Sequence, residues 1–279
     1  MTWTFTHDLA AYRAAAGAAV AADPVSNTLL LTVEGALLRR GPHAFSDRDP
    51  VYGWWTGADG AVAGGFLCTP PYPLVLGRVP GEAVAALGEA LGREPVLSGI
   101  GGFNARLADG ERLAEAWGRP QGEREVLRLY RLGELAAPDP APRGRARAAA
   151  EADLPLVREW CAAFAAEVGD PPPGEGGVRD RVAGGRMLLW EDAAGRPAAL
   201  AAFSPTEAGT SRIGPVYTPP ARRRRGYAAG ATHAAAGAAR AAGAREVLLF
   251  ADTANPTSTG VYLRLGFLPV EDRAVVVPR

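Results

Sequence analysis

The chain has 279 residues, 48% of them apolar, which is enough for a packed core in one large domain or two domains of ordinary size. Its 30 basic residues, all of them arginine, balance 30 acidic residues, so there is no net positive field of the kind that holds nucleic acid. The two cysteines, Cys68 and Cys161, are too few for a disulfide-stapled secreted fold and are expected to be buried thiols.

No targeting or metal-binding pattern stands out. Residues 1–8 contain no basic segment followed by an apolar one, so no signal peptide is expected. No run of about 18 apolar residues is free of charge or glycine, which argues against a membrane span. The histidines His7, His43 and His233 lack the spacing of metal ligands. We therefore expect a cytoplasmic chain without a metal, membrane or nucleic-acid partner, and its oligomeric state cannot be read from the sequence.

The first half is expected to alternate between helices and strands. Apolar periodicity predicts helices at 8–22, 28–38, 80–91 and 111–117, and strands at 52–56, 62–68, 74–76 and 126–132. Ser26 or Asn27 is expected to cap the second helix. The string Cys68-Thr-Pro-Pro71 recurs as Tyr217-Thr-Pro-Pro220, which indicates either an internal duplication or chance.

A proline-rich segment, residues 136–144, predicts a semi-rigid linker. We place a domain boundary near residue 140, which gives domains 1–138 and 143–279.

The second half has a clear order of elements. The predicted strands are 145–150, 187–191, 198–203, 210–218, 246–251 and 270–277, and the predicted helices are 153–168, 178–183, 227–244 and 256–265. Asp153 is expected to cap the first of these helices. The resulting order is β-α-α-β-β-β-α-β-α-β.

The chain is organised around residues 213–228, which predict a strand, a tight basic loop and a helix. Pro219 and Pro220 end the strand, and the arginines 222–225 and Gly226 precede an alanine-rich run. Backbone N–H groups at a helix start, beside fixed positive charge, form an anion site, and Gly226 lacks a Cβ that would keep a ligand away. The alternative is a solvated basic turn that caps the helix.

Two motifs in the second half resemble the GNAT superfamily of N-acetyltransferases. The spacing Arg223-x-x-Gly226-x-Ala228 resembles the family's pyrophosphate-binding loop, and Asn255 followed by Tyr262-x-x-x-Gly266-Phe267 resembles its second signature region. The resemblance covers about 143–279. It implies an α+β fold with a mixed central sheet flanked by helices, and, if the halves are duplicated, two tandem GNAT-like domains of which the first is degenerate.

The resemblance also implies roles for individual residues. Acetyl-CoA would be the co-substrate, its pantetheine arm pairing with the strand end at Val216, Tyr217 and Thr218, while Asn255 would bind that arm or orient the next helix. The loop would hold the phosphates through Arg223, Arg224, Arg225, Gly226, Tyr227 and Ala228, with Arg222 as a further candidate.

Tyr262 is the residue we expect to protonate the leaving thiolate, although an aromatic at this position could instead anchor its helix. Many family members have a glutamate on the strand before the loop, but residues 211–217 contain no carboxylate. Glu207, Asp252 or a water relay could therefore act as the base.

We expect an acetyl-CoA-dependent N-acetyltransferase that transfers an acetyl group directly to a primary amine of a small-molecule or peptide acceptor. The acceptor and the preferred acyl chain are open. The alternative is a non-catalytic CoA-binding regulatory module on the same fold. RNA binding through the arginine run is disfavoured by the neutral net charge and the lack of interleaved aromatic residues.

Overall fold

The computed structural model describes residues 1–119 and 122–277, which form two compact units. Unit 1 comprises Met1–Leu129, Asp252–Ala254 and Glu271–Arg279, and unit 2 comprises Tyr130–Ala251 and Asn255–Val270. The final strand therefore begins in unit 2 and ends in unit 1. The domain limits 1–138 and 143–279 stay a prediction, and each unit is described here by its own residues.

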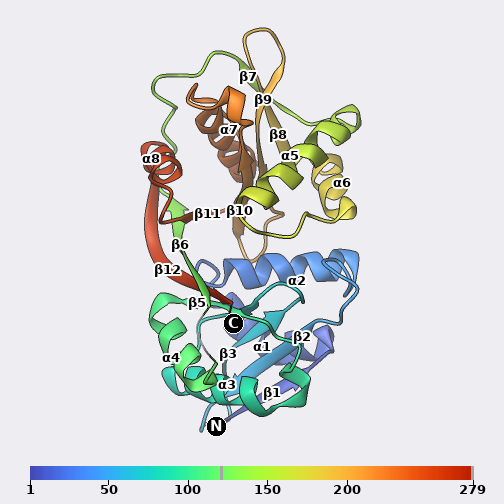
Figure 1. Cartoon of the computed structure of the whole chain (residues 1–279), viewed down its shortest axis with the longest axis vertical. Coiled ribbons are helices and arrows are strands. Elements are labelled where there is room, and N and C mark those ends of the chain that lie inside the picture. The colour runs from blue at the N-terminus through green and yellow to red at the C-terminus, as the bar shows by residue number, and fades with distance from the viewer. Residues whose placement is uncertain (120–121, 278–279) are drawn as a thin grey trace. The chain divides into compact units, whose positions relative to one another are not determined.

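Unit 1 is a sheet with helices on both faces (Figure 1). Its elements are β1 (Thr2–Thr6), α1 (Leu9–Ala21), α2 (Thr28–Arg40), β2 (Val51–Thr56), β3 (Val62–Cys68), β4 (Leu74–Leu76), α3 (Gly81–Arg93), β5 (Phe103–Arg106), α4 (Leu107–Trp117) and the start of β6 (Glu123–Leu132). The strand order is β1-β2-β3-β4-β5, and the end of β12 (Phe267–Val277) pairs antiparallel with β5. The predicted elements are confirmed, whereas β1 and β5 were not predicted.

The caps of the first two helices differ in chemistry. Asp8 caps α1, because its carboxylate accepts the N–H groups of Ala10 at 2.7 Å and Ala11 at 3.2 Å. Asn27 stands at the N-cap position of α2 as predicted, but its side chain does not cap the helix. Its Oδ1 accepts the N–H of Arg78 at 2.9 Å, and its Nδ2 donates to the carbonyl of Val20 at 2.9 Å. Asn27 therefore links the last turn of α1 to the loop that follows β4.

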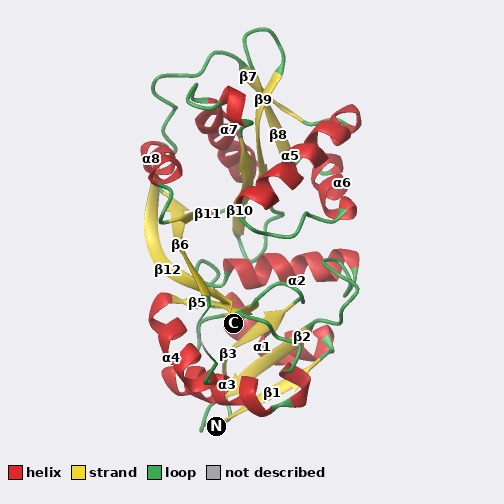
Figure 2. Cartoon of the chain, in the orientation of Figure 1, coloured by secondary structure: helices red, strands yellow, loops and turns green. Residues whose placement is uncertain are grey.

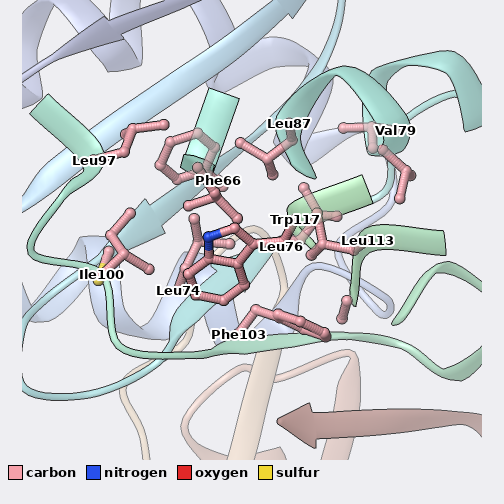
Figure 3. Close-up of a cluster of buried hydrophobic side chains, with 14 of the residues drawn as sticks. Phe66, Leu74, Leu76, Val79, Leu87, Leu97, Ile100, Phe103, Leu113 and Trp117 are labelled. Atoms are coloured by element: carbon pink, nitrogen blue, oxygen red, sulfur yellow. The ribbon is translucent and has the colours of Figure 1, made fainter. Parts of the chain in front are cut away.

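The sheet of unit 1 has a hydrophobic cluster on each face. One cluster packs α1 and α2 against alternate strand residues such as Tyr52, Leu67 and Val75. The other packs α3 and α4 against residues of the opposite parity, and Figure 3 shows Leu87 and Trp117 among the side chains of this cluster. This alternation is what a sheet covered by helices on both sides requires.

Unit 2 repeats the same order of elements. It consists of the end of β6, then β7 (Arg145–Ala148), α5 (Leu154–Glu167), α6 (Glu175–Ala183), β8 (Met187–Glu191), β9 (Pro197–Phe203), β10 (Thr210–Tyr217), α7 (Tyr227–Ala241), β11 (Glu246–Asp252), α8 (Pro256–Arg264) and the start of β12. Its strand order is β6-β11-β10-β9-β8-β7. Every element predicted in the second half is confirmed within a few residues.

Helices also cover both faces of the unit 2 sheet (Figure 2). One cluster contains α5 and α6 with Leu189, Leu200 and Tyr217, and the other contains α7 with Ile213, Val247 and Leu249. Within the residues that the structure describes, we find no helix that combines the length and the apolar character needed to cross a membrane.

Asp153 does not cap α5 with its side chain, contrary to the prediction. Its carboxylate instead accepts the Ala150 N–H at 2.8 Å and receives two hydrogen bonds from the guanidinium of Arg147. These hydrogen bonds with Arg147 lower the pKa of Asp153. The residue ties β7 to the turn that precedes α5.

The order β-α-α-β-β-β-α-β-α-β occurs twice in the chain, but the repeated string Thr-Pro-Pro does not mark equivalent places. In unit 1 it follows β3, whereas in unit 2 it follows β10, whose counterpart in the repeated order is β4. The three-residue match is therefore no evidence for a duplication, whereas the repeated order of elements is evidence for one.

Candidate active site

The two strands that lead into the basic loop and into α8 separate along their length. Strand β10 pairs parallel with β11 from Thr210 to Ile213, and the last pair is Ile213 with Leu249. On its other edge, β10 stays paired with β9 as far as Tyr217. In the described part of the chain, the edge of β10 after Ile213 thus has no strand beside it, and an extended ligand could add to that edge.

The loop after β10 presents unpaired backbone donors. Arg224 has a φ of 62° and Gly226 a φ of 79°, both in the left-handed region. Among the described residues, the N–H groups of residues 224–229 have no acceptor, and no side chain caps α7. The first turn of a helix with free N–H groups, preceded by left-handed residues, is a concave anion-binding arrangement. The N–H of Arg223 is not part of it, since it donates to the carbonyl of Pro220 at 3.3 Å.

Two of the four arginines are engaged by the protein itself. Arg222 donates to Asp192 at 2.7 Å, and backbone and arginine donors hold the pKa of that carboxyl well below its usual range. Arg223 donates from Nε to the carbonyl of Thr218 at 2.8 Å and from its terminal nitrogen to Glu167. These two side chains therefore fix the shape of the loop. From the sequence alone, both were candidates for phosphate binding.

The other two arginines project freely from the loop. Arg224 and Arg225 are exposed, and neither has a hydrogen-bond or ion-pair partner among the described residues. Both residues also contribute backbone N–H groups to the run at residues 224–229. They are the side chains of the run that can bind phosphate oxygens without losing a contact within the protein.

This division predicts different outcomes for neighbouring substitutions. Arg224→Gln and Arg225→Gln should each weaken binding of acetyl-CoA about tenfold, the worth of one hydrogen bond to a charged group. The loss should shrink at high salt, because exposed charges are screened. Neither change should lower the unfolding temperature.

Arg222→Gln is the matched comparison, since it should lower the unfolding temperature by removing a partner of Asp192. Calorimetric titration and thermal unfolding would check the pattern. Equal effects of all three substitutions on affinity would contradict it.

The end of β10 contains the residues predicted to meet the pantetheine arm. Val216 and Tyr217 pair with Ala201 and Leu200 of β9, which leaves their other edge open. The hydroxyl of Thr218 is buried and has no partner among the described residues, although its carbonyl is occupied by Arg223. A buried hydroxyl without a partner next to an open strand edge is consistent with a polar ligand at this place.

The first turn of α7 contains Tyr227 and Ala228, the last two residues predicted to hold the phosphates. Tyr227 is buried in the cluster that α7 forms with the sheet, and Ala228 is half-buried. A Cβ on Gly230 would lie 2.7 Å from the ring of Trp190, so glycine allows α7 to approach the sheet here. The predicted roles of Tyr227 and Ala228 thus concern their N–H groups, since their side chains face the protein.

Asn255 is the N-cap of α8. Its Oδ1 accepts the N–H of Ser258 at 3.1 Å, and its carbonyl accepts that of Thr259 at 3.2 Å. Of the two roles that the resemblance offered, orienting the following helix is the one for which the geometry supplies contacts.

Tyr262 lies on α8, and 9% of its surface is exposed. Its ring packs edge-on against Phe267 with 6.1 Å between centroids. The hydroxyl has no hydrogen-bond partner in the described part of the chain. Burial raises the pKa of Tyr262 to about 12, so the phenol keeps its proton at neutral pH. The residue is both a packing element and a proton donor without a partner.

The two carboxylates considered as bases are placed differently. Glu207 lies in the turn before Thr210, bonded to it through both backbone groups, at the end of β10 opposite the loop. Residues 210–214 span about 13 Å of strand, so Glu207 lies far from the open edge and its candidacy is not supported. Asp252 accepts the N–H of Ala254 at 2.8 Å and closes the turn after β11.

Unit 1 differs at the equivalent point of its sheet. There β4 and β5 pair in parallel at Leu74 and Val75, and the guanidinium of Arg273 from β12 then bonds to both strands. It donates to the carbonyls of Leu76 at 2.7 Å and Asn104 at 3.0 Å and to Oδ1 of Asn104 at 2.7 Å. Arg273 therefore fills the space between these strands with a side chain of the protein.

The helix that follows β4 also lacks an anion site. The N–H of Ala83 donates to the carbonyl of Pro80 at 3.0 Å, and Glu82 puts a negative charge in the first turn of α3. Among its described residues, unit 1 thus lacks the long run of free donors and the open strand edge that unit 2 has at this point. Sequence reasoning did not single out Arg273, which is one of three consecutive charged residues, 271–273, in the predicted strand 270–277.

Arg273→Met should destabilise the protein by about 3–5 kcal/mol, because it leaves three buried acceptors without their donor. Urea unfolding followed by tryptophan fluorescence would measure the change. Arg93→Gln, at a side chain that is 75% exposed, is the matched control and should shift the curve little. If the Arg273 variant had the same urea unfolding curve as the parent, these hydrogen bonds would make no net contribution to the free energy of unfolding.

Comparison with known proteins agrees with this geometry. Residues 154–267 match the model of the acetyltransferase (GNAT) family. The C-terminal half of the chain is therefore a GNAT domain, and acyl-CoA-dependent acetyl transfer is the general activity that this family supports. No curated protein matches the sequence.

Solved structures extend the likeness of fold to the whole chain. A GCN5-related N-acetyltransferase from Sphaerobacter thermophilus has a TM-score of 0.63 at 17% identity, with 98% of this chain and 94% of that one covered. A GNAT-family acetyltransferase from Colwellia psychrerythraea has a TM-score of 0.58 at 11% identity over the full length of both chains. A tandem GNAT protein from the clavulanic acid biosynthesis pathway has a TM-score of 0.56 at 15% identity, covering 99% and 97%. The chain thus has the mixed α/β fold of tandem GNAT proteins.

Proposed function

We propose that the protein is an acetyl-CoA-dependent N-acetyltransferase whose domain 143–279 carries the active site, with 1–138 as a degenerate copy. The observation that supports it most is the run of N–H groups at residues 224–229, which have no acceptor among the described residues and lie in the loop and first helical turn that follow a strand with an open edge. A pyrophosphate would occupy the first feature and an extended pantetheine arm the second.

The residues available fit such a ligand. The N–H groups of 224–229 and the side chains of Arg224 and Arg225 would bind the phosphates, and the open edge at Val216 and the hydroxyl of Thr218 would meet the pantetheine arm. Gly226 leaves the cradle uncovered. Bound acetyl-CoA would supply an acyl thioester as the donor.

In the reaction, an amine nitrogen forms a bond to the acyl carbon and the carbon–sulfur bond breaks. The amine loses one proton, and the departing thiolate takes up one. We assign the proton given to sulfur to the phenol of Tyr262, which burial keeps protonated. We assign the proton lost by the amine to water, because residues 210–217 carry no carboxylate.

Calorimetric titration with acetyl-CoA should give micromolar binding and a single site per chain. Amines would then be screened for release of the CoA thiol. The chain contains no lysine, so acetylation of the protein itself is limited to its N-terminus and adds little background. Absence of acetyl-CoA binding would overturn the proposal, and binding without turnover for any amine would favour the non-catalytic module.

A further inference from the structure

A charged side chain, that of Arg212, lies near the open strand edge of β10. Arg212 lies on β10 beside Leu248, one residue before the last pair with β11. Its neighbour Ile213 packs with α7, so Arg212 points to the opposite face, which α5 and α6 cover. The guanidinium carbon lies 6.0 Å from the ring centre of Phe250, the first β11 residue beyond that last pair. The charge of Arg212 therefore lies where β10 and β11 begin to separate.

The described residues do not neutralise the charge of Arg212. Arg212 is half-buried, its Nε is inaccessible to solvent, and that atom has no acceptor among the described residues. The described residues also provide no carboxylate as an ion-pair partner for it. Its charged neighbour is another arginine, Arg181 of α6. Burial, followed by the charge of Arg181, lowers the pKa of Arg212 to about 10, so the group stays protonated at neutral pH.

A half-buried guanidinium whose inaccessible Nε has no acceptor is costly, and such groups are normally paired. An apolar side chain would serve the same strand position at less cost, as it does at Ile213. The contact with Phe250 is worth about 1 kcal/mol and does not replace an ion pair. An arginine held in this state, with a second arginine near it, is suited to an anion that arrives with a ligand.

We propose that Arg212 binds the carboxylate of the acceptor, so that the acceptor is an amine that also carries a carboxylate, such as an amino acid or a short peptide with its carboxylate nearby. This deepens the proposed function and rests on it. A pantetheine arm that runs along β10 past Thr218 and Val216 would bring its thioester to the level of Gly214, two residues beyond Arg212. A carboxylate on Arg212 would then hold an amine a few bonds away beside the acyl carbon.

The first test uses binding alone. Thermal unfolding of the parent would be measured in sodium acetate and in sodium chloride at equal ionic strength. We expect acetate to raise the unfolding temperature more than chloride does, and Arg212→Gln to remove this difference. Arg179→Gln changes an exposed arginine of the same helix as Arg181 and should retain it. No acetate-specific effect in the parent, or an undiminished effect in Arg212→Gln, would overturn the proposal.

The second test uses turnover. Glycine, alanine and phenylalanine would be compared with their amides by release of the CoA thiol. We expect the free acids to have a kcat/KM about 30-fold or more above that of the amides, the value of a buried charge-assisted contact. Arg212→Gln should make the free acids and the amides react with the same kcat/KM and leave the affinity for acetyl-CoA unchanged. Arg212→Lys should give an intermediate ratio of the two kcat/KM values. Amides that react as well as acids would overturn the proposal.

Stability of the free protein separates this role from a structural one. Removing an unpaired buried charge should leave the unfolding temperature of Arg212→Gln unchanged or raise it by about 2–4 °C. A clear fall would assign Arg212 to the fold and overturn the proposal. Failure of acetyl-CoA to bind the parent would instead contradict the proposed acetyltransferase function, whatever result the acetate experiment gives.

Discussion

Gly226→Asp should abolish measurable binding of acetyl-CoA and leave the protein folded. The residue has a φ of 79°, which asparagine and aspartate tolerate better than other side chains. A Cβ would have its nearest neighbour, Pro142, at 3.4 Å, an ordinary contact. An aspartate at this N-cap position would bring a carboxylate to the first turn of α7.

The same carboxylate would repel the phosphates. A unit charge about 4 Å from a phosphate charge costs about 4 kcal/mol at an effective dielectric constant of 20, which weakens binding roughly 1000-fold. Gly226→Asn has the same shape without the charge, so it should lose far less affinity. Calorimetric titration of both variants beside the parent would measure the difference. An aspartate variant that binds acetyl-CoA within about threefold of the parent would contradict the assignment of the cradle.

The order of elements could be predicted from the sequence because its signals are local. Proline ends β10, an alanine-rich run follows the loop, and apolar strands alternate with turns. The strand β5 was missed because its sequence, Phe-Asn-Ala-Arg, has one large apolar side chain, whereas the shorter β4, Leu-Val-Leu, is wholly apolar. The strand β1 does alternate, as Thr-Trp-Thr-Phe-Thr, so its signal was present and was overlooked.

The division of labour within the arginine run could not be predicted in the same way. Arg223 depends on Glu167, which is 56 residues away, and Arg222 depends on Asp192, which is 30 residues away. Local spacing locates the loop and its glycine, but it does not state which guanidinium groups find a partner. Asn255 shows the opposite case, since its capping of Ser258 is local and follows from its position before Pro256.

The residues that distinguish the two units are the least predictable. Arg273 is separated by 169 residues from Asn104, which it bonds, and only the pairing of β12 with β5 brings them together. Arg212 is one arginine among 30 basic residues, and its lack of an ionic partner is visible only once the neighbouring strand and helix are in place. The side chain that closes the strand gap of unit 1 could therefore not be identified from the sequence.

Tyr262→Phe should lower kcat by about two to four orders of magnitude, the usual contribution of a positioned general acid. Affinity for acetyl-CoA should change little, because the substitution removes a single oxygen that has no partner among the described residues. Stability should also be nearly unchanged, since phenylalanine keeps the ring that packs edge-on against Phe267. Tyr262→Ala, which removes the ring as well, should lower the unfolding temperature and so measures the packing role separately.

The pH dependence gives a second and independent check on Tyr262. Burial raises the pKa of the phenol to about 12, so the acid form persists as pH rises and is lost only near that value. The kcat of the parent should therefore not fall between about pH 8 and 10. An unperturbed phenol would instead cause a fall in kcat near pH 10, and Tyr262→Phe would abolish that fall. Steady-state rates of thiol release across this range would decide it. A variant with parental kcat would reduce Tyr262 to an anchor of α8, and the thiolate would then take its proton from water.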